Sequence, residues 1–267
     1  MTEPLPAYSR LPLSFDAPQM QAELARLPEQ AWQAHFNTGY FTGDWSGIAL
    51  LAPPSATPSL LIDSQGAAAE PTAVLLDFPF WQQVFQRLPC TISSARLLRL
   101  GPGAQIREHC DPDLGRPDGD LRLHLPILSH PAVEFMLEGQ TIPMQAGEAW
   151  FLDLNRPHRV TNPSEQTRVH LVLDCQRNAW LLQQIANGLP STPLAQPARG
   201  SAQFAAFRAL VQQDPTLLEQ LVELEDPQQF AETAVALAAS LALYFTVDDV
   251  QAAMRQGRRA WIEQWVI

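Results

Sequence analysis

Three side chains, His109, Asp111 and His158, have the types and the spacing of a metal site. His109 and Asp111 are two residues apart in REHCDP, so both project to the same face of an extended segment, while Cys110 points the other way. His158 follows in LNRPHRVTN, after the strand-like GEAWFLDL. Two imidazoles and one carboxylate on an octahedral ion leave open positions, which suits Fe(II) that binds a bidentate co-substrate and dioxygen. The pattern therefore predicts a mononuclear Fe(II) site.

Two further segments carry cations that would attract an anion. Arg168 opens RVHLVLD, and a guanidinium binds a carboxylate through two parallel hydrogen bonds, which a lysine cannot do. In LRLHLPIL, Arg122 and His124 share the face opposite the leucines, so they predict an anion contact on the inner face of a barrel. The alternatives are a surface ion pair for Arg168 and a structural pair on an exposed sheet face for the other two.

Two tryptophans, Trp45 and Trp150, have two open interpretations. Packing within the core is the simpler one. Since substrate pockets are mostly apolar, either ring is also a candidate wall of a substrate pocket. His109 and Asp111 likewise have a simpler alternative, because the loop-like DPDLGRPDGD at this point is typical of a solvated turn. For His158 the alternative is a hydrogen bond to a neighbouring backbone group.

Composition describes a globular chain and excludes several classes of function. The 267 residues are 46% hydrophobic and 17% charged, which is enough apolar content for a sizeable core. The net charge is -11 and no cluster of lysine or arginine is present, so a nucleic-acid binder is not expected. The longest apolar run, residues 234–245, is too short to span a bilayer.

The sequence also bears on the cellular compartment. The three cysteines are far apart and form no CxxC pair, which argues against a disulfide framework. The segment MTEPLPAYSR has no cationic start followed by an apolar stretch, so no secretory signal is expected. A cytoplasmic location is the prediction.

Periodicity divides the chain into a strand-rich part and a helical part. Residues 16–34 fit an amphipathic helix, and residues 95–175 contain many short segments of alternating apolar and polar residues separated by turns. This pattern is typical of a sandwich or jelly roll. GLPSTPLAQPARG, at residues 188–200, is rich in proline, glycine and small polar residues. We therefore expect a jelly-roll domain over residues 1–187, a linker over 188–200 and a helical domain over 201–267.

The helical part shows three helix starts. Asp214–Pro215 and Asp226–Pro227 each pair a capping acceptor with a proline at the first helical position. Thr246 and Asp249 have the spacing of a capping box. These signals predict a small helical bundle, which would serve as a cap or a dimer surface.

Several motifs together resemble the aspartyl/asparaginyl β-hydroxylase family of 2-oxoglutarate oxygenases, especially its bacterial members. They are RLLRLGPGAQIREHCD, RLHLPI, MQAGEAWFLDLNRPHRVTNPS and RVHLVLDC, preceded by HFNTGYFTGDWSGIAL. A single HxD is common by chance, whereas this ordered set is specific. The resemblance covers roughly residues 30–176.

The resemblance implies an α+β chain built on a double-stranded β-helix, the cupin-like jelly roll, with an N-terminal flanking helix and the C-terminal bundle. It implies iron on His109, Asp111 and His158, and 2-oxoglutarate reaching from the metal to Arg168, with its metal-binding end near His124 and Arg122. Family members from animals lack the acidic ligand, whereas this sequence keeps Asp111. That departure weakens the transfer of the animal enzymes' protein substrate.

The implied activity is a dioxygenase that hydroxylates an unactivated C–H bond. The β carbon of an Asp or Asn residue in a peptide or protein is the substrate that the resemblance favours, and a free amino acid such as proline is the alternative, because bacterial relatives include proline hydroxylases. A jelly roll that binds metal without catalysis, as a sensor or scaffold, is the competing class.

The helical part weakly resembles a Nif11-type leader segment, through its two Asp-Pro pairs and the helix start FTVDD. This resemblance implies a peptide-maturation partner for residues 201–267. A homodimer surface is the alternative use of the same apolar helix faces.

Overall fold

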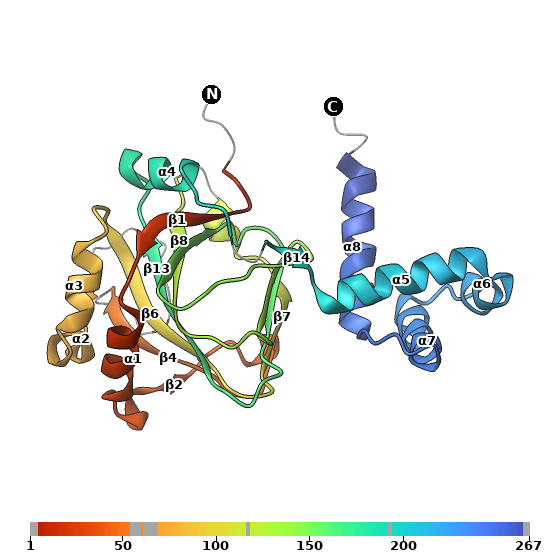
Figure 1. The fold of residues 1–267 in the computed structure, drawn as a ribbon, viewed down its shortest axis with the longest axis horizontal. Helices are drawn as coiled ribbons and strands as arrows, with labels where there is room; N and C mark the ends of the chain where they lie inside the picture. The colour runs from red at the N-terminus through yellow and green to blue at the C-terminus, as the bar shows by residue number, and fades with distance from the viewer. Residues whose placement is uncertain (1–4, 54–59, 61–68, 116–117, 192–193, 264–267) are drawn as a thin grey trace. The chain divides into compact units, whose positions relative to one another are not determined.

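The computed structural model describes residues 5–53, 60, 69–115, 118–191 and 194–263 of the chain. It forms two compact units. The first comprises Met1–Leu137 and Ile142–Leu194, and the second comprises Glu138–Thr141 and Ala195–Ile267. The first unit holds nearly all of the strands, and the second is mainly helical (Figure 1).

The first unit contains an 8-stranded antiparallel sheet in which β8, β13 and β6 are central. Its strand order is β1-β11-β8-β13-β6-β4-β2, and β5 pairs with β4 at one end. The strands are β1 (Tyr8–Ser14), β2 (Gln33–Ala34), β4 (Trp45–Ala52), β5 (Glu70–Pro71), β6 (Ile92–Leu100), β8 (Leu121–Leu128), β11 (Glu148–Leu152) and β13 (Arg168–Cys175).

A second antiparallel sheet faces the first. Within the first unit its order is β9-β12-β7-β3, from β3 (Phe41–Thr42), β7 (Gln105–His109), β9 (Glu134–Leu137) and β12 (His158–Thr161). The predicted double-stranded β-helix within an α+β chain is therefore confirmed. In the view of Figure 1, β7 lies across the interior of the barrel from β6 and β13.

Alternation of residue types along the central strands separates the two faces of the larger sheet. On β8, Leu121, Leu123, Leu125 and Ile127 belong to the main apolar core, whereas Arg122 and His124 face the opposite side and line a cavity. On β13, Leu171 and Leu173 lie in the core while Arg168 and Val172 line the cavity. Because successive side chains point to opposite faces of a strand, the sheet carries an apolar outer face and a charged inner face.

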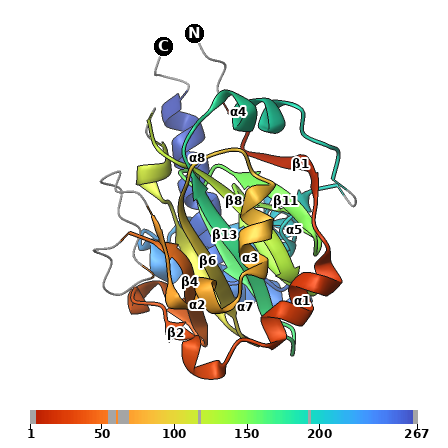
Figure 2. The same ribbon diagram turned by 90° about the vertical axis from the view of Figure 1, so that its left-hand side faces the viewer.

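Short helices cover the apolar outer face. They are α1 (Ala17–Ala25), α2 (Ala73–Asp77), α3 (Phe80–Gln86) and α4 (Ala179–Ala186), and Figure 2 shows α1, α2 and α3 in front of the large sheet. The described part of the unit also contains three short 3₁₀ turns: η1 (Glu29–Ala31), η2 (Thr38–Tyr40) and η3 (Pro112–Gly115). Trp81 of α3 and Met20 of α1 are fully buried in the core beneath these helices.

The N-terminal helix is shorter than its sequence pattern indicates. Its start is capped as expected, since the Asp16 side chain accepts a hydrogen bond from the Gln19 amide at 3.0 Å. The helix ends at Ala25, not near Ala34. Pro28 explains the early end, because a proline disfavours helical geometry in the residue before it and breaks the chain of backbone donors.

The second unit contains four helices in its described part: α5 (Arg199–Gln213), α6 (Pro215–Val222), α7 (Pro227–Ser240) and α8 (Val247–Glu263). A short pair of strands, β10 (Gln140–Thr141) and β14 (Gln196–Pro197), also belongs to it. Phe204, Phe207 and Phe245 pack together in a separate apolar core. No helix among the described residues is long and apolar enough to cross a membrane.

All three predicted helix starts in this unit occur. The side chains of Asp214 and Asp226 cap α6 and α7, each followed by proline. Before α8, the Asp249 amide donates to Thr246 Oγ1 at 3.2 Å, and the Thr246 amide donates to Asp249 Oδ2 at 2.8 Å. This reciprocal pair satisfies two backbone donors at the helix end.

The burial of the outer face of β13 leads to a stability prediction. Leu171 is fully buried in the core, so Leu171→Ala is expected to reduce the free energy of unfolding by about 2–5 kcal/mol. Leu76 of α2 is 62% exposed, so the matched Leu76→Ala variant is expected to stay within about 0.5 kcal/mol of the parent. Urea denaturation followed by circular dichroism measures both, and equal losses would contradict the assigned core.

Candidate metal and anion site

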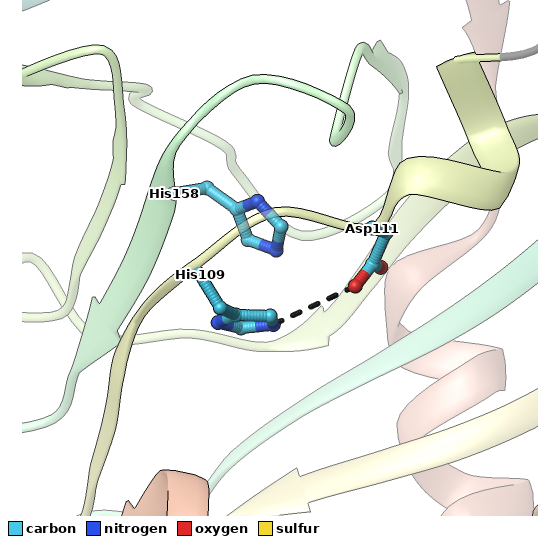
Figure 3. A group of neighbouring side chains, drawn as sticks. All are labelled: His109, Asp111 and His158. Atoms are coloured by element: carbon cyan, nitrogen blue, oxygen red, sulfur yellow. Dashed lines mark ion pairs between the residues drawn. The ribbon is translucent and has the colours of Figure 1, made fainter.

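Two neighbouring strands bring the three predicted metal ligands together. His109 ends β7 and His158 begins β12, and the two residues are direct partners in the strand pairing. Asp111 follows β7, where its amide donates to the Leu154 carbonyl at 2.8 Å. One ligand atom from each of the three residues lies within 4.8 Å of the others, and Figure 3 shows the side chains converging. The arrangement has the ligand types and spacing of a mononuclear metal centre.

Backbone contacts select the tautomer of both histidines. His109 Nδ1 lies 2.8 Å from the Arg107 carbonyl oxygen, and His158 Nδ1 lies 3.0 Å from the Arg156 carbonyl oxygen. A carbonyl only accepts, so Nδ1 of each ring carries the hydrogen. Each Nε2 therefore presents a lone pair, as a metal ligand must.

The two oxygens of Asp111 have different neighbours. Oδ1 lies 3.7 Å from His109 Nε2, on the side of the other two ligands. Oδ2 accepts a short hydrogen bond from Nη1 of Arg122. The same guanidinium donates through Nε to Asp174 Oδ1 at 2.6 Å and through Nη2 to Asp174 Oδ2 at 3.3 Å. Arg122 is thus held between two carboxylates.

The electrostatics of the site favour the protonation states that bind a cation. Burial, together with the neighbouring His109, lowers the pKa of His158 to about 4. Burial raises the pKa of Asp111, but Arg122 and the two histidines lower it more, so the net pKa is below the usual range. At neutral pH His158 therefore offers a neutral imidazole and Asp111 a charged carboxylate.

The three ligands open into a cavity of about 320 Å³ between the two sheets. Arg122, His124, Arg168 and Trp45, all singled out from the sequence, line this cavity. Among the described residues that line this cavity, Trp150 is absent. Its ring lines a different cavity of about 650 Å³, beside β1 and α4, and its Nε1 donates to Glu148 Oε2 at 2.8 Å.

Arg168 is a buried cation without a carboxylate partner among the described residues. Its side chain is 3% exposed, and burial lowers its pKa to about 9. Nη2 donates to His170 Nδ1 at 2.7 Å, and Nε has no hydrogen-bond partner in the described part of the chain. An unpaired buried charge costs free energy, so this position favours an anionic ligand.

His124 lies beside this arginine and also has an unsatisfied atom. Its Nδ1 is 3.4 Å from His170 Nδ1, and its buried Nε2 has no partner within the described residues. Burial, followed by the nearby Arg168, lowers the pKa of His124 well below 6.5. The imidazole is therefore neutral and keeps one polar atom for a ligand.

Three further residues of the site were missed in the sequence. Arg96 of β6 lines the cavity, donates to Asp174 Oδ2 at 2.7 Å and leaves its buried Nε without a partner among the described residues. Asp174 itself is fully buried. Extending the alternation along ARLLRL and RVHLVLD would have placed both on the inner face.

His35 is the third, and no local pattern marks it. Its ring stacks on Trp45 with centroids 3.5 Å apart, and it lines the cavity. The Asn37 amide donates to His35 Nδ1 at 3.3 Å, so the neutral ring carries its hydrogen on Nε2. Burial, followed by Arg96, lowers the pKa of His35 to about 4.

A jelly roll that combines two histidines, one carboxylate and a buried arginine without a carboxylate partner among the described residues has the residue types of a metal-dependent enzyme. Comparison with known families agrees, because the aspartyl/asparaginyl beta-hydroxylase family matches residues 16–178. The chain belongs to this family.

The individual relative that the chain matches has low sequence identity to it. The chain is 24% identical over 170 residues to the L-proline cis-4-hydroxylase of Rhizobium meliloti strain 1021, covering 63% of this chain and 60% of that protein. The chain therefore spans less than two thirds of the length of the curated relative that it matches.

Two solved structures resemble the fold. An oxidoreductase of the 2OG-Fe(II) oxygenase family from Burkholderia pseudomallei has 17% identity and a TM-score of 0.43, covering 64% of this chain and 86% of its own. A prolyl-4-hydroxylase from Pseudomonas putida has 16% identity and a TM-score of 0.39, covering 65% and 94%. At these values neither likeness informs function.

The buried histidines lead to a pH prediction. Folding lowers the pKa of His35 and His158 from 6.5 to about 4, so below pH 6.5 the unfolded chain binds more protons than the folded one. The metal-free protein should lose stability as the pH falls from 6.5 toward 4, by at most about 1.4 kcal/mol per pH unit for each histidine.

Urea unfolding at pH 7, 6 and 5, in the presence of a chelator, measures this loss. The variant His35→Gln should show a shallower dependence on pH, because one of the titrating groups is gone. An unfolding midpoint that stays constant from pH 7 to pH 5 would contradict the assignment.

Proposed function

We propose that the protein is a hydroxylase that uses Fe(II) and 2-oxoglutarate. The observation that carries this proposal is the combination, in one cavity, of three converging ligand atoms and a buried arginine without a carboxylate partner among the described residues. Membership of the aspartyl/asparaginyl beta-hydroxylase family supports it.

In this proposal His109, Asp111 and His158 hold the iron. The residues fit the ion, because both Nε2 atoms present lone pairs and Asp111 presents Oδ1 on the same side. Two imidazoles and one carboxylate form the facial set that leaves open positions on Fe(II). A structural zinc site would instead use a closed tetrahedron of protein ligands.

Arg168 binds the far carboxylate of 2-oxoglutarate in this proposal. Pairing would satisfy the buried Nε and neutralise a charge that has no carboxylate partner in the described part of the chain. His124 lies in the same cavity, beside His170. The phenyl ring of Phe135, 5.7 Å from the Arg168 guanidinium, keeps this end of the cavity apolar.

Bound Fe(II) and 2-oxoglutarate would supply the activation of dioxygen, with release of succinate and carbon dioxide and insertion of one oxygen atom into a C–H bond. The chain contributes orientation and exclusion of water. The Trp45–His35 stack forms one wall, and the guanidinium of Arg168 fixes the co-substrate.

Two substrate classes follow from the comparisons. The family description names aspartyl and asparaginyl residues, which favours the β carbon of Asp or Asn in a peptide or protein. A free amino acid such as proline is the second candidate, and the relative from Rhizobium meliloti acts on L-proline.

One feature of the cavity favours the free amino acid. Arg96 is buried, lines the cavity and has an unsatisfied Nε, so it suits a carboxylate carried by a small substrate. The α-carboxylate of a free amino acid provides that group, and so does the side chain of an Asp residue, whereas an Asn residue within a peptide does not. The feature thus favours the free amino acid over an asparaginyl peptide only. We also propose a cytoplasmic setting, in keeping with three cysteines that form no disulfide in the described part of the chain.

The primary test is direct. Anaerobic protein mixed with Fe(II) and 2-oxoglutarate is expected to give a visible charge-transfer band that His158→Ala abolishes, and to release succinate in air. Arg168→Gln should weaken 2-oxoglutarate binding about tenfold to 100-fold, because a charged hydrogen bond is lost. Arg168→Lys should fall between, since a point charge lacks the planar fork.

Arg99→Gln is the matched control, because Arg99 lies on the same sheet but pairs with Glu29 and Asp44 outside the cavity. It should bind 2-oxoglutarate as the parent does. Absence of both the band and succinate would favour the alternative of a metal-binding scaffold or sensor.

A second test separates the substrate classes. Arg96→Gln is expected to raise KM for a free amino acid at least about tenfold while leaving KM for 2-oxoglutarate near the parent value. Succinate release with free amino acids, and with Asp- or Asn-containing peptides whose termini are blocked, measures the preference. Turnover of the blocked peptides that Arg96→Gln leaves unchanged would reject the free amino acid and support the peptide.

A further inference from the structure

Arg122 was expected from the sequence to lie near the metal-binding end of 2-oxoglutarate, and its contacts suggest a different task. Its Nε and Nη2 edge binds Asp174, and its Nη1 binds Oδ2 of Asp111. Every nitrogen of the guanidinium therefore already has a carboxylate partner. Arg168 and Arg96 differ, because each keeps an unsatisfied Nε within the described residues.

We infer that Arg122 is a positioning residue that makes Asp111 bind the metal through one oxygen only. This inference rests on the proposed function, because it concerns the metal ligand of that site. Oδ2 is engaged by Arg122, and Oδ1 is the oxygen on the side of His109 Nε2. The two oxygens are thus assigned to different partners before any metal arrives.

The chemical consequence concerns the open positions of the metal. A carboxylate that is free to rotate can chelate a cation through both oxygens and take up a further position. One-oxygen binding leaves that position for the two donor atoms of the co-substrate and for dioxygen. The planar fork of arginine suits this task, because its rigid geometry fixes the direction of each hydrogen bond.

Asp174 holds Arg122 in place. It is fully buried and also accepts from Arg96 at 2.7 Å, so its two oxygens bind two arginines. The chain of contacts runs Arg96, Asp174, Arg122, Asp111 and contains two positive and two negative groups. A compensated set of this kind can remain charged in a buried place.

The test uses Co(II) bound anaerobically to the full chain, with two readouts: the dissociation constant and the visible ligand-field spectrum. Removal of a nearby cation alone would tighten the binding of a divalent ion, because like charges repel. Loss of a group that orients a ligand has the opposite effect, typically 10–100-fold weaker binding. The direction of the change therefore separates positioning from simple charge.

We expect Arg122→Gln to weaken Co(II) binding about tenfold or more, because the direction of the Asp111 carboxylate is no longer fixed, and to change the ligand-field spectrum. Arg122→Lys keeps a cation beside Asp174, so it guards against a variant that does not fold. A single ammonium cannot serve both carboxylates, so this variant should also weaken binding and alter the spectrum. Arg99→Gln is the control and should match the parent in both readouts.

The proposed function and the positioning role of Arg122 are overturned by different results. A parent protein that binds no Co(II) at His109, Asp111 and His158, with His158→Ala as the reference, would overturn the proposed function. If the parent binds Co(II) while the folded Arg122 variants bind it equally or more tightly with an unchanged spectrum, the positioning role alone is overturned.

Discussion

The site depends on one buried carboxylate, Asp174, which neutralises two arginines on the inner face of the large sheet. Without it, Arg96 and Arg122 would be buried cations on the two strands that flank β13, and their repulsion together with burial would be costly. With it, Arg122 can reach Asp111 and Arg96 can face the cavity. Asp174, near the end of β13, therefore permits both the contact of Arg122 with Asp111 and the position of Arg96 at the cavity.

The antiparallel order of the central strands makes this arrangement possible. Asp174 lies directly opposite Arg122 of β8, while β13 also pairs with β6, the strand that carries Arg96. Residues on one face of neighbouring strands are close enough for their side chains to interact. The same strands place their leucines on the outer face under the helices, so the core and the charged cavity arise from one alternation.

The sequence predicted the jelly roll and the helix caps because strand alternation and capping are local signals. It grouped the three ligands because His109 and Asp111 are only two residues apart and His158 follows a predicted strand. It missed His35, whose place depends on stacking with Trp45 across an irregular segment. The contacts of Arg122 depend on a cross-strand partner, Asp174, that no short stretch of sequence contains. The cavity that Trp150 lines is formed with β1 and α4, which are also distant in the sequence. The predicted domain bounds and the partner of the helical part remain predictions.

The charges around the cavity also limit what can bind there. Three buried guanidiniums, those of Arg96, Arg122 and Arg168, are accompanied by two carboxylates, Asp111 and Asp174, while Asp113 lies exposed at the rim, where solvent screens it. A divalent cation at the triad would increase this positive excess. A substrate with a cationic group near the metal is therefore disfavoured, because its burial there would add repulsion to desolvation. The carboxylate of an aspartyl side chain or of a free amino acid suits this charge, whereas the α-ammonium of a free amino acid would have to lie away from the metal. The position of Arg96 relative to the ligand, and not charge alone, therefore has to distinguish the two substrates.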